Sequence, residues 1–212
     1  MIKAVIFDLD GVLLETEPQT FNFFKEYLKD FGVYLKDQDL SKKIGRKSVD
    51  FFNDVLSPEQ LKRINTRELV ELKRNKFHED LQKYTRPIPF AKQVVAELKR
   101  KKLKLGLASQ NEDVMIRKVL NWLDLENDFQ TILTLQDIQH KKPHPEIYQI
   151  AMAILEVAPE ESMVVEDSLT GIEAAKASGA RVVALQHPYT PLDHIIKADE
   201  VVTDLRQILD LS

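Results

Sequence analysis

The sequence predicts an α/β protein in which a parallel sheet carries helices on both faces and an all-helical segment interrupts the chain after the first strand. Two observations lead to this prediction. Short apolar runs alternate with segments of helical periodicity from about residue 86 to the C-terminus, which is the pattern of strand–helix–strand units. Residues 16–84, by contrast, show helical periodicity and no convincing strand.

The first strand is predicted over Val5–Phe7, a short apolar run that ends at Asp8. Helical spacing begins soon afterwards, and Ser57 followed by Pro58 is a typical start of a further helix, since serine caps the first turn and proline suits its first position. The expected domains are an α/β core of residues 1–15 and 86–212 and a helical domain of residues 16–85.

The remaining elements alternate in order along the chain. One of the helical stretches ends at Gly179, a residue type that is common just after a helix. The expected strands are 103–108, 131–133, 163–166, 182–185 and a weaker one near Val201. The expected helices are 90–101, 113–123, 145–155, 171–178 and 205–209.

Charge and composition exclude several classes of function. The 212 residues include 30 Lys and Arg against 34 Asp and Glu, a net charge of −4, so the chain has no bulk attraction for nucleic acid or anionic lipid. The absence of cysteine excludes disulfides, thiolate metal sites and a cysteine nucleophile. No apolar run approaches the roughly 18 residues that span a bilayer, and no signal-peptide cleavage site is visible. We therefore expect a cytoplasmic protein without nucleic-acid or membrane partners, and a monomer, since no coiled-coil seam occurs.

Reactive side chains follow three of the predicted strands at their carboxyl ends. Asp8 ends the first strand, Ser109 follows another, and Glu166 and Asp167 end a third. Lys142 lies in a loop just before a helix, on the same side if the alternation holds. Because ligands of an open parallel sheet bind at the carboxyl ends of its strands, we expect these side chains to meet there.

This set of side chains fits Mg²⁺-dependent phosphoryl chemistry. Clustered carboxylates repel one another unless a cation lies among them, and an all-oxygen ligand set favours Mg²⁺ over zinc. Asp8 can attack phosphorus as a nucleophile, while Ser109 and Lys142 can bind the phosphoryl oxygens. Asp10 is placed to protonate the leaving alcohol and then to activate a water molecule. Each residue alone has an ordinary interpretation as a turn, cap or surface residue; their ordered combination carries the prediction.

The ordered motifs resemble those of the haloacid dehalogenase superfamily of phosphohydrolases, and its β-phosphoglucomutase-like phosphatases in particular. The motifs are Asp8-Leu9-Asp10-Gly11-Val12, Ser109, Lys142-Pro143-His144-Pro145 and Glu166-Asp167-Ser168 with Gly171-Ile172. The resemblance covers essentially the whole chain and implies a Rossmann-like parallel-sheet core with an inserted all-helical cap domain that closes over the substrate.

The resemblance also implies a role for each matching position. Asp8 would be the nucleophile and a metal ligand, and Asp10 the general acid and base, with its backbone carbonyl on the metal. Asp167 would bind the metal directly, and Glu166 directly or through water. The phosphoryl group would be held by Ser109, Lys142, the backbone of Gln110 and Asn111.

The expected function is Mg²⁺-dependent hydrolysis of small phosphomonoesters, sugar phosphates above all, through an aspartyl-phosphate intermediate. Asp10 argues against carbon–halogen cleavage, because dehalogenase members of the family lack this second aspartate. A sugar-phosphate mutase of the β-phosphoglucomutase type is an alternative, but that enzyme has a cap-hinge histidine, and no histidine occurs here between Asp10 and His78. A non-catalytic phospho-accepting module is an alternative from another class; the long insertion and the base Asp10 both argue against it.

Arg46 and Lys47 are the candidate specificity residues of the helical domain. They follow Gly45 and precede Ser48, so that two cations lie beside a flexible glycine. This loop could meet a second anionic group of a substrate, and an ordinary solvated turn is an equally good interpretation of it.

Overall fold

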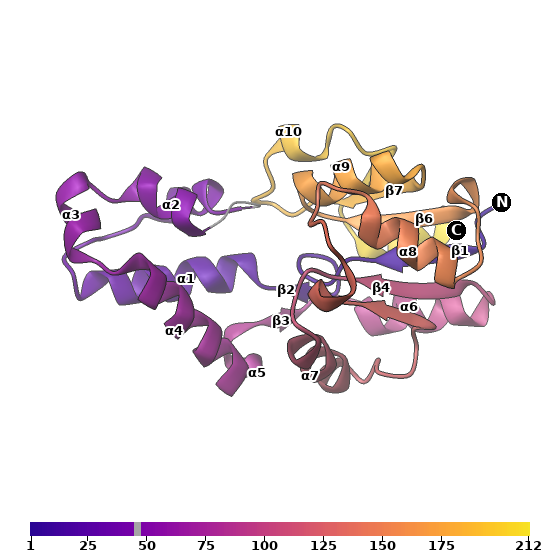
Figure 1. Cartoon of the computed structure of the whole chain (residues 1–212), viewed down its shortest axis with the longest axis horizontal. Coiled ribbons are helices and arrows are strands. Elements are labelled where there is room, and N and C mark those ends of the chain that lie inside the picture. Colours follow the sequence, from indigo (N-terminus) through magenta and orange to yellow (C-terminus); the bar gives the residue numbers. More distant parts are fainter. Residues whose placement is uncertain (45–47) are drawn as a thin grey trace. The chain divides into compact units, whose positions relative to one another are not determined.

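The computed structural model describes residues 1–44 and 48–212, and the chain divides into two compact units (Figure 1). The first unit comprises Met1–Leu14 and Pro87–Ser212, and the second comprises Glu15–Arg86. The expected specificity residues Arg46 and Lys47 lie outside the described residues.

The first unit contains the predicted parallel sheet. Its strand order within the described residues is β5-β4-β1-β6-β7-β8, and all five pairings are parallel. The strands are β1 (Ala4–Phe7), β4 (Lys104–Ala108), β5 (Thr131–Leu133), β6 (Ser162–Glu166), β7 (Arg181–Leu185) and β8 (Glu200–Val202). Every strand that the sequence predicted is present, and β1 lies between β4 and β6.

The helices of the first unit follow the predicted alternation with small shifts. They are α6 (Ala91–Arg100), α7 (Asp113–Leu123), α8 (Glu146–Ile154), α9 (Leu169–Ser178) and α10 (Leu192–Ile195), with 3₁₀ helices η2 (Leu135–Asp137), η3 (Pro159–Glu161) and η4 (Leu205–Asp210). Helix α9 begins two residues before its predicted start, because Ser168 caps it by accepting a hydrogen bond from the Gly171 N–H at 3.1 Å. The short turn α10 was not predicted. None of the helices in the described residues combines the length and the apolar character needed to span a membrane.

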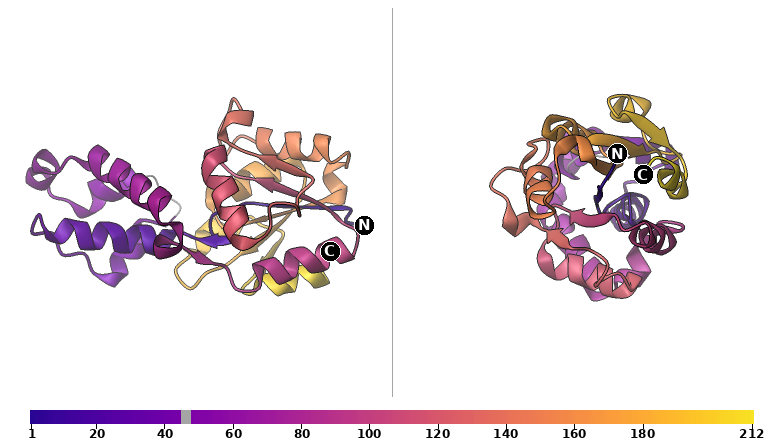
Figure 2. Two further views of the ribbon diagram at one scale, coloured as in Figure 1. Left: turned by 90° about the horizontal axis from the view of Figure 1, so that it is seen from below. Right: turned by 90° about the vertical axis from the view of Figure 1, so that its right-hand side faces the viewer.

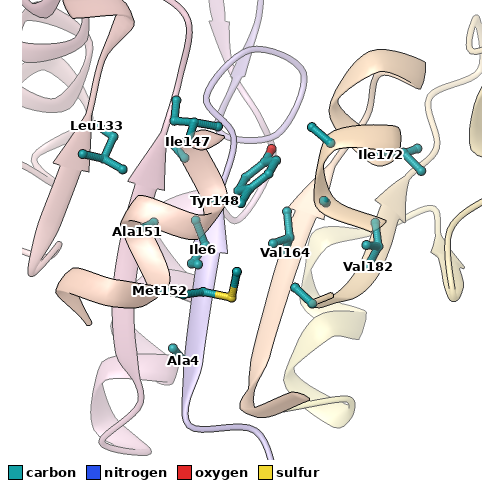
Figure 3. Packing of buried hydrophobic residues seen from close by; sticks show 14 of the residues in the cluster. Ala4, Ile6, Leu133, Ile147, Tyr148, Ala151, Met152, Val164, Ile172 and Val182 are labelled. Atoms are coloured by element: carbon teal, nitrogen blue, oxygen red, sulfur yellow. The ribbon is translucent and has the colours of Figure 1, made fainter. Parts of the chain in front are cut away.

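Both faces of the sheet are covered. Ala4 and Ile6 on β1 belong to a fully buried cluster with α8 and α9, and Figure 3 shows Tyr148 and Met152 of α8 beside Ile6. Val5 and Phe7 alternate with them and are also fully buried, as expected when successive side chains of a strand point to opposite faces. Helix α6 contacts β4 and η4 contacts β8 on this second face (Figure 2).

The second unit is helical and has its own aromatic core. Its elements are α1 (Glu17–Lys29), η1 (Asp37–Lys42), α2 (Ser48–Val55), α3 (Pro58–Arg63), α4 (Thr66–Glu79) and α5 (Leu81–Tyr84). Buried phenylalanines of α1 and α2 pack edge to face, with 4.9 Å between the ring centroids of Phe24 and Phe52. The predicted cap at Ser57 is confirmed, since its Oγ accepts a hydrogen bond from the Gln60 N–H.

A two-stranded sheet that the sequence did not predict lies where the chain passes between the two units. Strand β2 (Leu14–Glu15) pairs with β3 (Arg86–Pro87). Strands of two residues are too short to show an alternating pattern. The pairing brings the start and the end of the inserted segment together.

Substitution of Ile6 by alanine should destabilise the first unit. Ile6 is fully buried in the cluster under α8, so its truncation removes apolar burial and leaves a cavity that costs about 3 kcal/mol. Ile154→Ala is the matched control, because this isoleucine lies on α8 with 52% of its surface exposed and its truncation should change the free energy by less than about 0.5 kcal/mol. Urea unfolding measures both variants, and equal losses would contradict the assignment of the core.

Candidate active site

A buried lysine is the centre of the candidate site. The Lys142 Nζ donates hydrogen bonds to Asp8 Oδ1 at 2.5 Å, to Glu166 Oε1 at 2.7 Å and to the Ala108 carbonyl at 3.2 Å. The lysine side chain is only 5% exposed, and that of Glu166 is fully buried. An ammonium group and two carboxylates therefore share one water-poor space at the carboxyl ends of the central strands.

The sheet register explains why these residues meet. Phe7 of β1 pairs with Val165 of β6, and the Asp8 N–H continues the ladder by donating to the Val165 carbonyl at 3.0 Å. Glu166, the next residue, is thereby placed beside Asp8. On the other side β1 pairs with β4, which ends at Ala108, so Ser109 emerges at the same edge and is almost fully buried.

Glu166 is held by more partners than Lys142 alone. The Tyr148 hydroxyl donates to Oε1 at 2.8 Å, while the backbone N–H groups of Asp167 and Ser168 donate to Oε2 at 2.9 and 3.0 Å. Gly171 leaves the room that this carboxylate occupies, because a Cβ at that position would lie 1.7 Å from Glu166 Oε1. These contacts fix the orientation of Glu166 and, through it, the position of the lysine.

Tyr148 was missed by the sequence analysis, although a signal was available. It lies on the apolar face of the predicted helix 145–155, and a buried tyrosine usually finds a partner for its hydroxyl. A tyrosine hydroxyl on the buried face of that helix indicated a hydrogen-bond acceptor nearby. In the structure this acceptor is Glu166.

Asp8, Glu166 and Lys142 shift one another's pKa values. Burial and the nearby Glu166 carboxylate raise the pKa of Asp8 from its usual 3.8 to about 7, against the opposing charge of Lys142. Burial also acts to raise the pKa of Glu166, but Lys142 and the accepted hydrogen bonds hold that pKa below its usual value. Although burial opposes it, the two carboxylates raise the pKa of Lys142 well above its usual range. The lysine therefore stays positively charged. Of the two carboxylates, Asp8 is the one whose negative charge is less well compensated by its surroundings.

Three carboxylates at this edge can share a cation. Ligand oxygens of Asp8, Glu166 and Asp167 lie within 4.8 Å of one another. Gly11 makes this possible at Asp167, because a Cβ at Gly11 would lie 1.9 Å from Asp167 Oδ2, and its φ of +75° is one that glycine adopts readily. An all-oxygen set of this kind fits Mg²⁺, which would also offset the charge deficit at Asp8.

The predicted residues Gln110 and Asn111 follow Ser109 in the loop after β4, whereas Asp10 lies in the turn after β1. The Asn111 Nδ2 donates to Asp10 Oδ2 at 2.5 Å, and its backbone N–H donates to Ser109 Oγ at 3.2 Å. Asn111 is thus engaged with Asp10, a contact the sequence analysis did not foresee. The buried Nε2 of Gln110 has no hydrogen-bond partner among the described residues.

His187 is a second residue that the sequence analysis missed. Its Nε2 lies 2.7 Å from the Gly11 carbonyl, and its ring is buried and stacks on Tyr189. The histidine follows the carboxyl end of β7, so the rule that selected Asp8 and Ser109 also applied here. The contact of His187 with the Gly11 carbonyl holds the turn in which Asp10 lies.

Comparison with known proteins agrees with the ordered motifs. Residues 5–185 match the haloacid dehalogenase-like hydrolase family. The phosphorylated carbohydrates phosphatase of Thermotoga maritima is 28% identical over 221 residues, which cover 98% of this chain and 100% of that protein. YhcW of Bacillus subtilis, a phosphatase candidate, is 32% identical over 190 residues, which cover 90% of this chain and 86% of YhcW.

A solved structure agrees as well. The crystal structure of a β-phosphoglucomutase candidate from Thermotoga maritima matches with a TM-score of 0.75 and 27% identity, over 99% of this chain and 98% of the other. The motifs, the parallel sheet and these relatives lead to one conclusion: the chain belongs to the haloacid dehalogenase-like hydrolase family.

Proposed function

We propose that the protein is a Mg²⁺-dependent phosphatase that hydrolyses small phosphomonoesters, sugar phosphates above all, through a phosphorylated Asp8. The observation that carries the proposal is the Asp8 carboxylate, which is held by the buried Lys142 beside the carboxylates of Glu166 and Asp167. The relatives named as phosphatases, one of them of phosphorylated carbohydrates, support the same reaction and substrate class.

In the first step Asp8 attacks phosphorus, so that a bond from its carboxylate oxygen forms while the ester P–O bond breaks. Asp10 gives its proton to the leaving alkoxide. In the second step Asp10 takes a proton from water, the hydroxide attacks the acyl phosphate, and inorganic phosphate leaves with Asp8 restored. The hydrogen bond from Asn111 to Asp10 Oδ2 would hold the Asp10 side chain in position.

The remaining groups hold the phosphoryl oxygens and balance charge. Lys142 and Ser109 would bind these oxygens, and the Gln110 Nε2, which has no hydrogen-bond partner in the part of the chain that the structure describes, is available to extend the site. Asp8, Asp167 and the Asp10 carbonyl would hold Mg²⁺, which would supply positive charge that reduces repulsion between nucleophile and phosphate. Glu166 is already engaged by Lys142 and Tyr148, so we assign it to positioning the lysine and to outer contacts with the ion.

The second unit, Glu15–Arg86, is proposed to be the cap that selects the leaving group and excludes water. Within it Lys43 is buried and paired with Glu17 at 2.8 Å. The chain is proposed to act as a monomer on a small phosphorylated metabolite.

Asp8→Asn should abolish phosphate release. The amide cannot act as the nucleophile, so kcat/KM should fall at least about 10³-fold across a panel of sugar phosphates. Asp210→Asn makes the same chemical change at an exposed position of the first unit and should leave the rate unchanged. Assays with Mg²⁺ and with EDTA test the metal requirement. Full activity of Asp8→Asn would refute the mechanism.

Assays with the same panel of sugar phosphates distinguish the phosphatase from a mutase and from a phospho-accepting module. A mutase would return an isomerised sugar phosphate and require a bisphosphate, and it would release little inorganic phosphate. A phospho-accepting module would hold a long-lived phosphate on Asp8 without turnover. Either result would contradict the phosphatase proposal.

Without Mg²⁺, Asp8 should make the protein less stable as the pH rises from about 4 to about 7. Its raised pKa of about 7 means that the folded state keeps a proton that the unfolded chain releases over this window. The contribution therefore favours the folded state below the window and is lost as the pH rises through it. Asp8→Asn should be more stable than the wild type at about pH 8, on the order of 4 kcal/mol, with little difference at about pH 4.

Urea unfolding in EDTA at the two pH values measures this difference. Adding Mg²⁺ at the higher pH should stabilise the wild type and leave Asp8→Asn nearly unchanged, because binding to the folded state alone raises stability. Parallel pH profiles of the two proteins would show that Asp8 does not titrate in this window.

A further inference from the structure

A second group of metal-binding side chains lies on the loop before α8 and at the first residue of that helix, on both sides of Lys142 in the sequence. It consists of His140, His144 and Glu146, whose ligand atoms lie within 4.8 Å of one another. The His140 Nδ1 is 2.9 Å from Glu146 Oε2, and the two imidazole centroids are 4.5 Å apart. Nothing in the proposed phosphatase reaction uses these three side chains.

The carboxylate of this group is held in place by the backbone. The N–H of Gln139 donates to Glu146 Oε1 at 3.0 Å, and the N–H of His140 donates to Oε2 at 2.7 Å. His144 stands between two prolines, whose rings fix φ and limit the freedom of the loop. The carboxylate and the loop backbone are therefore restricted before a cation arrives, which lowers the entropic cost of binding it.

The group is also open to solvent. The side chains of His140 and His144 are 61% and 49% exposed, whereas that of Glu146 is 20% exposed. A cation can reach the imidazoles directly, and water can complete its coordination.

We propose that His140, His144 and Glu146 form a Zn²⁺ site that is distinct from the carboxylate site at Asp8. Two imidazoles and one carboxylate are a ligand set that zinc uses, whereas Mg²⁺ takes oxygen ligands. The ligands of the two sites thus differ in chemical hardness: the imidazoles favour Zn²⁺, and the all-oxygen group suits Mg²⁺. The proposal does not depend on the phosphatase reaction.

Zn²⁺ bound at His140, His144 and Glu146 would affect the loop that carries Lys142. Lys142 lies between His140 and His144 in the sequence, and its Nζ is bound to Asp8 and Glu166. Zn²⁺ would tie the loop to the first turn of α8 and so restrict the backbone on both sides of the lysine.

Zn²⁺ titration by isothermal calorimetry tests the site in the full chain. The titration is done in excess Mg²⁺ and in the Asp8→Asn background, which removes a ligand of the carboxylate site, and the chain has no cysteine to compete. One equivalent should bind, and adding His140→Ala with His144→Ala should weaken the affinity at least about tenfold. His78→Ala, a histidine of the second unit, is the matched control and should bind like the parent.

Glu146→Gln provides a second variant that keeps the size of the side chain, and it should also bind Zn²⁺ more weakly. Amide hydrogen exchange gives an independent readout, because Zn²⁺ should slow exchange of residues 139–147 in the parent and not in the double histidine variant. Unchanged Zn²⁺ affinity in the histidine variants, or no binding up to about 100 μM Zn²⁺, would overturn the proposal.

Discussion

One ammonium group shared by two buried carboxylates governs the arrangement of this molecule's candidate site. If Lys142 were absent, Asp8 and Glu166 would be like charges in a water-poor space, and one of them would have to take up a proton. The lysine can reach both only because β1 and β6 are adjacent and in register. Tyr148 and Gly171 serve the same arrangement, one by donating to Glu166 and the other by leaving it room.

Much of the fold could be read from the sequence because it rests on local patterns. The alternation of strands and helices predicted the parallel sheet, and even the three-residue strand at 131–133 is present with the predicted bounds. The rule that ligands bind at the carboxyl ends of parallel strands selected Asp8, Ser109 and Glu166, which the structure places at one edge. Family membership also followed from the ordered motifs.

What the sequence could not supply are contacts between segments that are far apart along the chain. The hydrogen bond from Tyr148 to Glu166 spans 18 positions, and that between His187 and Gly11 spans 176. Such pairs depend on strand order, which alternation alone does not determine. The strands β2 and β3 were missed for a different reason, since two residues carry no periodicity. The hydrogen bond from Asn111 to Asp10 was not predicted either, because a loop's side-chain directions are not set by its sequence spacing.

The pairing of β2 with β3 has a consequence for how such a protein can diverge. Both ends of the segment Glu15–Arg86 meet at this small sheet, and none of the segment's described residues belongs to a strand of the larger sheet. An insertion whose ends lie together can be exchanged for one of another length while every pairing of the larger sheet is kept. Recombination at this junction would then yield chimeras that keep the phosphoryl chemistry of the first unit and, with the proposed cap exchanged, differ in substrate preference.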